Sequence, residues 1–371
     1  MYIANNEKIM RIDFLTLICI FSLGTCALLP SCTKGEEVPQ EQTETPDQPA
    51  GPDETTPPEK PEKPEEPAGP DPAVYPEGVN VTEHSFKHDD GTSTRYFVGK
   101  VDVKKNPKLK FHALFNSPKK TPSQNYKEFD FKENIPYIIT NAGYFAAATS
   151  MSLVIKNSFC EAVAPFNMSW PNAEHPKYTI HPVRAAFGQM KDGSFRIDWV
   201  FCCDPAGRIH YSFPSALDNN EKTETFMKEG PTPNTPGAEK WQPVNAVGGG
   251  PMLVHDGKDV AMENYWKECL NSGGTAGASH VQRTGIGLDK DGNPIVIVCE
   301  GRKINNSTGL TLSELAQVFI EQGAVSAMNL DGGGSSAFIG KGGKRLTAGS
   351  SERKVVSSLA FSLDVKTKSG N

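Results

Sequence analysis

Four Asp-Gly dipeptides constrain the fold of this chain more than any other feature. They lie at residues 90–91, 192–193, 256–257 and 291–292, and apolar or alternating runs flank each of them. Asp-Gly suits the positive φ angles of a type I′ turn, so each dipeptide predicts a β-hairpin. We therefore expect 184–190 to return as 195–201, and 285–288 to return as 294–299. A body built mostly from antiparallel strands follows.

One helix is predicted near the C-terminus. Thr311-Leu-Ser-Glu314 has the pattern of a capping box, and Gly323 marks the end of the helix. Apolar residues recur between them at helical spacing: Leu312, Leu315, Ala316, Phe319 and Ile320. The helix lies between two apolar runs, 295–299 and 325–330, which predicts a βαβ unit with two parallel strands. The expected fold class is α+β: mixed, mostly antiparallel sheets with a C-terminal βαβ unit that carries the site.

The first 76 residues indicate export and a tether. Lys8 and Arg11 precede an apolar stretch that ends at Leu29-Pro30-Ser31-Cys32, which resembles the lipobox of a bacterial lipoprotein. Residues 1–32 are thus predicted to be a signal peptide whose Cys32 receives the lipid. Residues 33–76 are dominated by Pro, Glu, Thr and Gln, so they have little apolar surface to bury and predict a disordered stalk. We expect an exported lipoprotein on the periplasmic or cell-surface face of the outer membrane.

The charge and the cysteine content constrain the possible functions less strongly. Residues 33–73 contain 12 acidic residues and three lysines, whereas the whole chain has a net charge of −6, so the folded body is mildly cationic. This charge suits an anionic substrate and gives no basic stripe for nucleic acid. Five cysteines follow Cys32, none in a CxxC spacing, so they indicate no zinc pattern and leave free thiols and disulfides both open: Cys160, Cys202, Cys203, Cys269 and Cys299.

Two carboxylates are predicted to share one cleft. Glu300 follows the first strand of the βαβ unit and Asp331 follows the second. Because both strands would point the same way, their carboxyl ends would lie along one edge of the sheet, where ligands usually bind. Paired carboxylates are what glycosidic hydrolysis requires, with one as acid or base and the other as nucleophile or base.

Glycine and arginine next to these acids indicate a phosphate site. Asp331 leads into Gly332, Gly333, Gly334 and Ser335, whose N–H groups can form an anion-binding nest, and Glu300 leads into Gly301-Arg302. Three further candidates agree by residue type: the Asn141 amide after a buried strand, a second glycine loop containing Gly249 and Gly250, and Arg283 before a strand. Taken singly, each of the three is more often structural, and His280 alone is more often an ordinary surface histidine.

Five motifs together resemble the phosphodiester glycosidase family, typified by the animal lysosomal uncovering enzyme. They are Asn-Ala-Gly-Tyr-Phe from 141, Gly-Gly-Gly-Pro from 248, Arg-Thr-Gly-Ile-Gly from 283, Glu-Gly-Arg from 300 with Thr-Leu-Ser-Glu-Leu-Ala from 311, and Asn-Leu-Asp-Gly-Gly-Gly-Ser-Ser from 329. The resemblance covers about residues 135 to 362 and implies that Asn141, Arg283, Glu300, Arg302 and Asp331 line the cleft. Glu300 stands where members often carry Asp, and residues 303–306 replace a Pro-Gly-Tyr-like loop.

The expected function is therefore hydrolysis of the bond between a sugar anomeric carbon and a phosphodiester, with α-N-acetylglucosamine-1-phosphodiester as one candidate substrate. The nest at Gly332–Ser335, with Arg283 and Arg302, would bind the phosphodiester, and Asp331 or Glu300 would act as nucleophile or base. We expect a body with an N-terminal β-rich part, 77–135, and a catalytic domain, 136–365. No cofactor and no metal are expected. The alternatives are a non-catalytic glycan-binding lipoprotein that uses Trp170 and Trp241, and a metal-dependent phosphodiesterase that uses Asp289 and Asp291.

Overall fold

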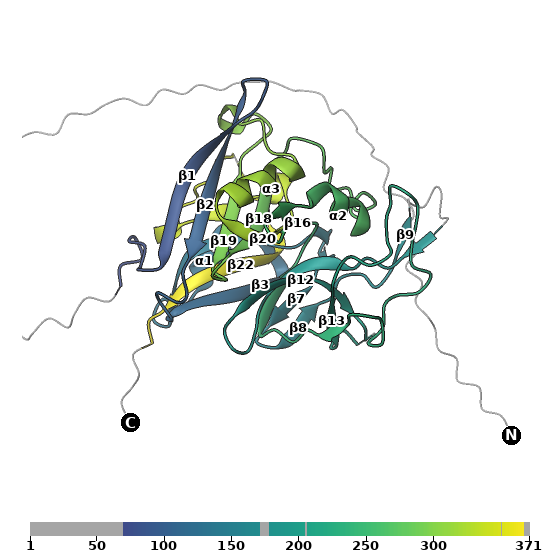
Figure 1. Ribbon diagram of the computed structural model, residues 1–371. Coiled ribbons are helices and arrows are strands. Elements are labelled where there is room, and N and C mark those ends of the chain that lie inside the picture. The colour runs from purple at the N-terminus through teal and green to yellow at the C-terminus, as the bar shows by residue number, and fades with distance from the viewer. Residues whose placement is uncertain (1–69, 171–177, 205, 350, 367–371) are drawn as a thin grey trace, which may run out of the picture. The chain divides into compact units, whose positions relative to one another are not determined.

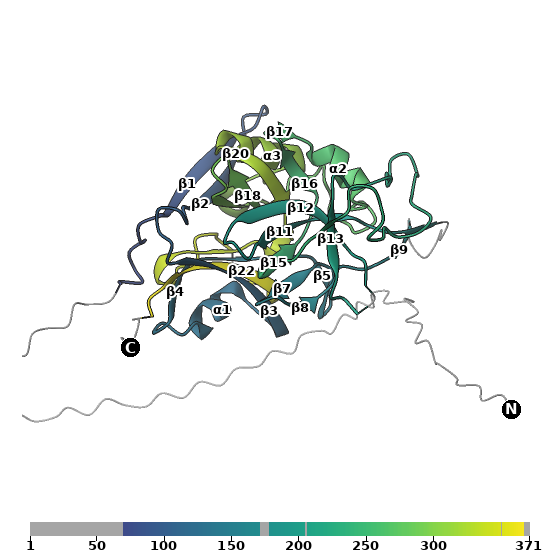
Figure 2. The ribbon, with the colours of Figure 1, turned by 60° about the horizontal axis from the view of Figure 1, so that its bottom comes forward.

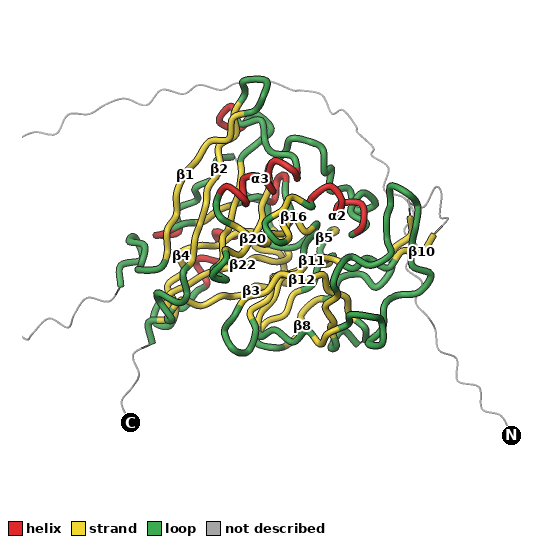
Figure 3. Tube along the Cα trace, viewed as in Figure 1, coloured by secondary structure: helices red, strands yellow, loops and turns green. Residues whose placement is uncertain are grey.

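Antiparallel β-strands dominate the structure, and helix is confined to short segments (Figures 1 and 3). This computed structural model describes residues 70–170, 178–204, 206–349 and 351–366. The predicted signal peptide, Cys32 and nearly all of the predicted stalk lie outside the described residues. Within them, no helix has the length and apolar character needed to cross a membrane.

The largest sheet, which we call the central sheet, has the strand order β1-β2-β19-β18-β20-β16-β17. Every neighbouring pair in it is antiparallel. Its strands are β1 (Val79–Lys87), β2 (Ser93–Val101), β19 (Pro294–Cys299), β18 (Arg283–Asp289), β20 (Ala324–Asn329), β16 (Met252–His255) and β17 (Lys258–Asp259).

Two further sheets and two short strand pairs complete the β structure. A seven-stranded sheet contains β14 (Glu239–Lys240), β13 (His210–Phe213), β12 (Phe195–Cys202), β11 (Arg184–Gln189), β15 (Asn245–Gly248), β7 (Val154–Lys156) and β8 (Phe159–Ala162), in that order. A four-stranded sheet contains β21 (Phe338–Ile339), β4 (Asn134–Asn141), β22 (Val355–Asp364) and β3 (Leu109–Lys120). The pairs are β9 (Met168–Trp170) with β10 (Tyr178–Ile180), and β5 (Phe145–Ala146) with β6 (Thr149–Ser150).

The central sheet is buried on both faces, because alternate residues of its strands enter different cores. Ile295 and Ile297 of β19 pack with the helices α2 (Ala261–Lys267) and α3 (Leu312–Glu321). Val296 and Val298 face the main core, which also receives side chains from the other two large sheets. Helix α1 (Pro122–Glu128) covers the outer face of the four-stranded sheet, as Figure 2 shows.

Helix α3 was predicted correctly, and its packing explains two glycines of the Arg-Thr-Gly-Ile-Gly motif. Thr311 caps the helix in a capping box with Glu314, and Gly323 has a positive φ of 92° after it. A Cβ on Gly285 or Gly287 of β18 would lie 2.7 or 2.9 Å from the ring of Phe319. Only glycine allows the helix to approach the strand this closely.

The expected α+β class with a βαβ unit is wrong. Strands β19 and β20 do point the same way around α3, but β18 lies between them and is antiparallel to both. All pairings between the described strands are antiparallel, and the three α-helices have only 7, 7 and 10 residues. The fold is therefore mostly β.

All four Asp-Gly hairpins form, although only one has the expected turn. Asp256 and Gly257 both have positive φ, 50° and 73°, as a type I′ turn requires. At the other three sites only the glycine has positive φ, and its N–H donates to the carbonyl three residues earlier, as Gly292 does to Asp289 at 3.0 Å. Those turns are type I followed by a left-handed glycine, the usual three-residue hairpin loop.

Candidate active site

Antiparallel pairing around β18 brings three chain segments to one edge of the central sheet. Arg283, the first residue of β18, lies opposite Cys299, the last residue of β19, and Gly285 lies opposite Asn329 at the end of β20. The residues beyond these ends therefore meet at the same edge. Glu300 and Asp331 reach this edge although their strands are not neighbours.

The backbone of Asp331 is fixed by the end of β4. Its N–H donates to the carbonyl of Ala142 at 2.9 Å, and the side-chain amide of Asn141 donates to its carbonyl at 2.6 Å. The Asn141 Oδ1 accepts from the Thr284 hydroxyl at 2.9 Å, so both ends of this amide are used inside the protein. Asn141 is fully buried and joins two sheets next to Asp331, so its amide is not available to a substrate in the cleft that the family resemblance implied it would line.

Burial raises the pKa of the Asp331 carboxyl to about 6, because a desolvated carboxylate is disfavoured. The Ser335 hydroxyl, the N–H of Gly332 and the charge of Arg353 act in the opposite direction. The Gly332 N–H donates to Oδ1 at 2.9 Å. The carboxyl remains partly accessible. A side chain with these properties can exchange protons near neutral pH and can still reach a ligand.

The glycine segment after Asp331 forms a tight turn against the chain before β18. A Cβ on Gly332 would lie 2.7 Å from the Gln282 carbonyl oxygen, and Gly333 has a φ of 58° with its N–H donating to that same oxygen at 2.8 Å. The N–H of Ser335 donates to Gly332 at 3.2 Å. Of the predicted nest, only the Gly334 N–H donates to no group in the described residues.

A cleft of about 670 Å³ opens beside this turn. Its lining includes Glu300, Gly333, Gly334 and two arginines, Arg345 and Arg353. A third arginine lies at the turn, because the Nη2 atom of Arg302 is 3.4 Å from the point where a Cβ on Gly333 would stand. Three guanidinium groups around a glycine turn give a strongly anion-binding environment.

Glu300 is held firmly within this cleft. Its side chain is 1% exposed, and its Oε1 accepts from the Arg95 guanidinium at 3.2 Å and from the Ala348 N–H at 2.7 Å. Asn305 donates to both carboxylate oxygens, at 3.3 and 3.1 Å. Four hydrogen bonds leave the Glu300 carboxylate with little freedom to move toward a ligand.

The segment that follows Glu300 is conformationally strained. Four non-glycine residues have positive φ: Arg302 (54°), Lys303 (65°), Asn305 (49°) and Asn306 (59°). Such backbone persists only where surrounding contacts impose it, and it gathers at functional sites. Residues 303–306 in this segment are also those that we expected to depart from the family pattern.

Arg283 does not reach the cleft as a phosphate ligand. Its side chain is buried, and its guanidinium donates to four backbone carbonyls at 2.9 to 3.1 Å, namely those of Leu310, Thr275, Ala276 and Ser279. In this arrangement Arg283 organises the loop that precedes β18.

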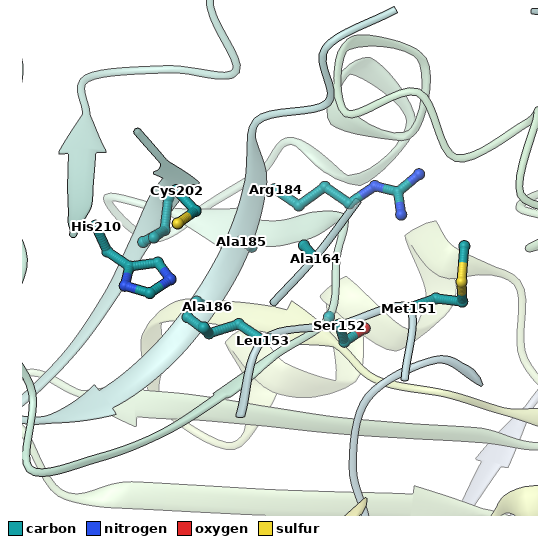
Figure 4. A pocket seen from close by; sticks show the side chains of 12 residues that line it. Met151, Ser152, Leu153, Ala164, Arg184, Ala185, Ala186, Cys202 and His210 are labelled. Carbon is teal, nitrogen blue, oxygen red and sulfur yellow. The ribbon is translucent and has the colours of Figure 1, made fainter. Parts of the chain in front are cut away.

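Gly249 and Gly250 have packing roles. The N–H of Gly249 donates to Ala185 and that of Gly250 to Asn329, so neither amide is free for a ligand. A Cβ on either residue would lie 2.4 Å from an oxygen, of Asn329 or of Glu268. Gly249 lines a separate, mainly apolar cavity with Arg184 and Met151, shown in Figure 4.

Sequence reasoning missed three residues that line or shape the cleft. Arg345 and Arg353 lie in polar stretches that look like solvated surface, and Gln282 has no motif of its own. Gln282 is buried, and its Oε1 has no hydrogen-bond partner among the described residues, so it offers an acceptor to a bound molecule. Tertiary structure brings them to the site: Gln282 directly precedes β18, Arg345 bridges to Ile339 of β21, and Arg353 lies two residues before β22.

Comparison with known protein families shows to which family this chain belongs. The model of the phosphodiester glycosidase family matches residues 134–362, which is more than half of the chain. The chain belongs to the phosphodiester glycosidase family. The family resemblance drawn from the five motifs is thus confirmed.

Individual relatives match shorter stretches or only the fold. The human N-acetylglucosamine-1-phosphodiester alpha-N-acetylglucosaminidase is 31% identical over 101 residues, which cover 26% of this chain and 19% of that protein. The SPbeta prophage-derived uncharacterized protein YomE of Bacillus subtilis is 38% identical over 82 residues, covering 22% of this chain and 12% of YomE. The match therefore spans a fifth or less of either relative.

Two solved structures share the fold. The catalytic domain of the zebrafish N-acetylglucosamine-1-phosphodiester alpha-N-acetylglucosaminidase, auto-inhibited by its pro-peptide, aligns with a TM-score of 0.50 at 16% identity. The alignment covers 79% of this chain and 86% of that one. A hypothetical protein from Synechocystis aligns with a TM-score of 0.53 at 16% identity, covering 77% and 62% of the two chains.

Proposed function

We propose that this chain hydrolyses the glycosidic bond between a sugar anomeric carbon and a phosphodiester in a cell-envelope or extracellular glycan. One observation carries the proposal: Asp331, whose carboxyl has a pKa of about 6, directly precedes the glycine turn that lines a cleft together with Arg345 and Arg353. An α-N-acetylglucosamine-1-phosphodiester is the first substrate to test, because that compound class appears in the names of the mammalian relatives.

The cationic lining suits the leaving group of this reaction. When the bond to the anomeric carbon breaks, the phosphodiester departs as a phosphomonoester and its negative charge increases. Arg302, Arg345 and Arg353 can neutralise that charge, and the free N–H of Gly334 can donate to a phosphate oxygen. Because the leaving group is already stabilised, a strong general acid is less necessary than in an ordinary glycoside.

Asp331 is the carboxylate that we assign to the sugar carbon. In its ionised form it would act as nucleophile or as the base that activates water, and water finally supplies the hydroxyl of the free sugar. Glu300 is the weaker candidate because four hydrogen bonds already engage its oxygens. We propose that Glu300 positions Arg95 and the strained 302–306 segment around the cleft.

The first test is the Asp331→Asn variant, assayed by the release of free sugar from sugar-1-phosphodiesters and nucleotide-sugars. Asparagine keeps the size of the side chain and removes its negative charge, so turnover should fall by roughly a thousandfold or more. Glu300→Gln should retain more activity than Asp331→Asn, because its amide still fits the same pocket.

Asp256→Asn is the matched control, because Asp256 lies at an exposed hairpin turn distant in sequence from Asp331. This variant should keep wild-type turnover. Near-wild-type release of sugar by a folded Asp331→Asn variant would contradict the assignment. Binding of the same compounds without any release by the wild-type chain would favour the non-catalytic alternative.

The burial of its two candidate tryptophans gives the glycan-binding alternative no support. A glycan-binding module needs an open aromatic platform, yet Trp170 and Trp241 are 8% and 1% exposed.

The metal-dependent phosphodiesterase alternative also finds no support at its predicted ligands. Asp289 accepts hydrogen bonds from the N–H groups of Asp291 and Asn293, and so shapes the hairpin turn.

We further propose that the chain is exported and anchored to the outer membrane through lipid on Cys32. The support is the sequence alone: a short charged and apolar leader, Leu-Pro-Ser-Cys, and an acidic Pro-rich tract. Replacing Cys32 by Ser should move the protein from the membrane fraction to the soluble fraction of the expressing cell. Equal membrane retention of both proteins after a carbonate wash would refute lipid anchoring at this residue.

A further inference from the structure

Two histidines and a glutamate converge at the tip of the β1–β2 hairpin. His88 lies in the turn after β1, His280 lies in the loop before β18, and Glu314 lies in the first turn of α3. Their ligand-type atoms all lie within 4.8 Å of one another. No other such group of three is found in the described residues.

The donor atoms point at one another. His88 Nδ1 lies 2.9 Å from Glu314 Oε1, and His280 Nε2 lies 3.1 Å from the same oxygen. The two imidazole rings are nearly perpendicular, at 85°, with centroids 5.0 Å apart. Two imidazole nitrogens and one carboxylate oxygen form the His₂Glu set that binds Zn²⁺ with a fourth position open to water.

Surrounding contacts hold two of the three side chains in place. Glu314 Oε2 accepts from the Thr311 N–H at 2.7 Å in the capping box and also lies 3.0 Å from His280 Nε2, while Oε1 faces both imidazoles. The other nitrogen of His88, Nε2, lies 2.8 Å from the buried Thr94 hydroxyl. Thr94 donates its hydroxyl proton to Gly309 O at 3.0 Å, so its oxygen can accept a hydrogen bond from a protonated His88 Nε2. That tautomer leaves Nδ1 with a lone pair directed at Glu314, where a cation would be favourable.

We propose that His88, His280 and Glu314 form a binding site for a divalent transition metal, with Zn²⁺ as the best match. In a tetrahedral zinc site neighbouring ligand atoms are about 3.3 Å apart. The two imidazole nitrogens, at 2.9 and 3.1 Å from Glu314 Oε1, are already within a few tenths of an ångström of that spacing. His280 can make this adjustment because its side chain is 43% exposed, whereas that of His88 is 5% exposed.

The site joins three segments that are distant in the sequence, and this indicates a structural role. It links the β1–β2 hairpin, helix α3 and the loop that leads through Gln282 to the glycine turn. The proposal is independent of the proposed reaction, because none of the three side chains lines the cleft. The metal would secure the loop that shapes the cleft without taking part in the chemistry.

Titration of the tag-free full chain with ZnCl₂ after EDTA treatment tests the proposal. Wild type should bind one Zn²⁺ per chain, and a hundredfold excess of Zn²⁺ over its Kd should raise the thermal midpoint by roughly 5 °C. Mg²⁺ should give no shift, since it prefers octahedral oxygen ligands. His280→Ala should weaken Zn²⁺ binding at least tenfold without loss of the fold, because this side chain is exposed.

His255→Ala is the matched control, since His255 is 45% exposed and also lies beside a carboxylate, that of Asp256. This variant should bind Zn²⁺ as wild type does. The proposal is overturned by an absence of saturable binding in wild type, by binding that His280→Ala leaves unchanged, or by equal weakening in both variants. His88→Ala gives a second check on the buried ligand, with circular dichroism to verify its fold.

Discussion

At the scale of single residues, the carboxylate that we propose to react, Asp331, lowers the stability of the folded protein. Its pKa is raised to about 6 by burial, so the folded protein binds the proton more tightly than the unfolded chain, whose aspartates titrate near 4. Stability is therefore lost as the pH rises from about 4 to about 6, and the loss persists above that range. Asparagine at this position removes the penalty.

We accordingly expect Asp331→Asn to be more stable than wild type at pH 7, while the two proteins should be close in stability at pH 4. A shift of about two pKa units corresponds to at most about 3 kcal/mol, and partial solvent access reduces this figure. Urea unfolding at both pH values measures the difference. A variant that is equally or less stable than wild type at pH 7 would show that burial does not disfavour the Asp331 carboxylate.

The Asp192→Asn variant should show the opposite dependence of stability on pH. Hydrogen bonds from the hydroxyl and the N–H of Ser194 lower the pKa of Asp192, so its ionised form stabilises the folded protein. That contribution is present above the unfolded pKa and is lost as the pH falls. The Asp192→Asn variant should thus become less stable relative to wild type as the pH rises, which is the reverse of the trend at Asp331.

Sequence reasoning singled out Asp331, the carboxylate that we propose to react, but not the residues that complete its surroundings. Asp331 adjoins its glycines in the sequence, and Arg302 lies two residues after Glu300, so each of these two motifs could be read directly. Arg345 and Arg353 could not be found, because a charged residue in a polar stretch looks the same whether it faces solvent or a cleft. Asn141 and Arg283 were found, but the groups to which they donate depend on tertiary contacts that no local pattern records.

At the scale of secondary-structure elements, the sequence predicts what is local and fails where strand order matters. The Asp-Gly turns and the capping box depend on neighbours a few residues away, and all five elements form. The parallel pairing of β19 and β20 was inferred from a strand, a helix and a strand in succession. That spacing is the same whether the two strands are adjacent or separated, and β18 fills the position between them.

Although the predicted βαβ unit is wrong, the expectation that Glu300 and Asp331 reach one edge of the sheet still holds. A strand between β19 and β20 still leaves both strands pointing the same way, so their carboxyl ends share an edge. The intervening strand adds its own amino end there, and with it Gln282. An antiparallel neighbour therefore contributes a third segment to the cleft, which a plain βαβ unit would not supply.

At the scale of the whole molecule, the first three strands belong to the same sheets as the family-matched segment 134–362. Strand β2 pairs with β19 from Tyr96 to Lys100, and β3 pairs with β22 along most of its length. These pairings place Phe97 and Phe111 in the main core. A chain that begins at residue 134 would expose an edge of both sheets and remove part of that core.

We therefore expect residues 134–366 alone to be insoluble or to lack a cooperative thermal transition, because unpaired edges and missing core side chains together exceed the net stability of an ordinary domain. A chain that begins at residue 68, the start of the compact unit, should unfold in one sharp transition. Circular dichroism and thermal melts of the two proteins at equal concentration measure the difference. A sharp single transition for 134–366 would mean that this segment folds without strands β1 to β3. The cleft would then fold without the contact between Arg95 and Glu300.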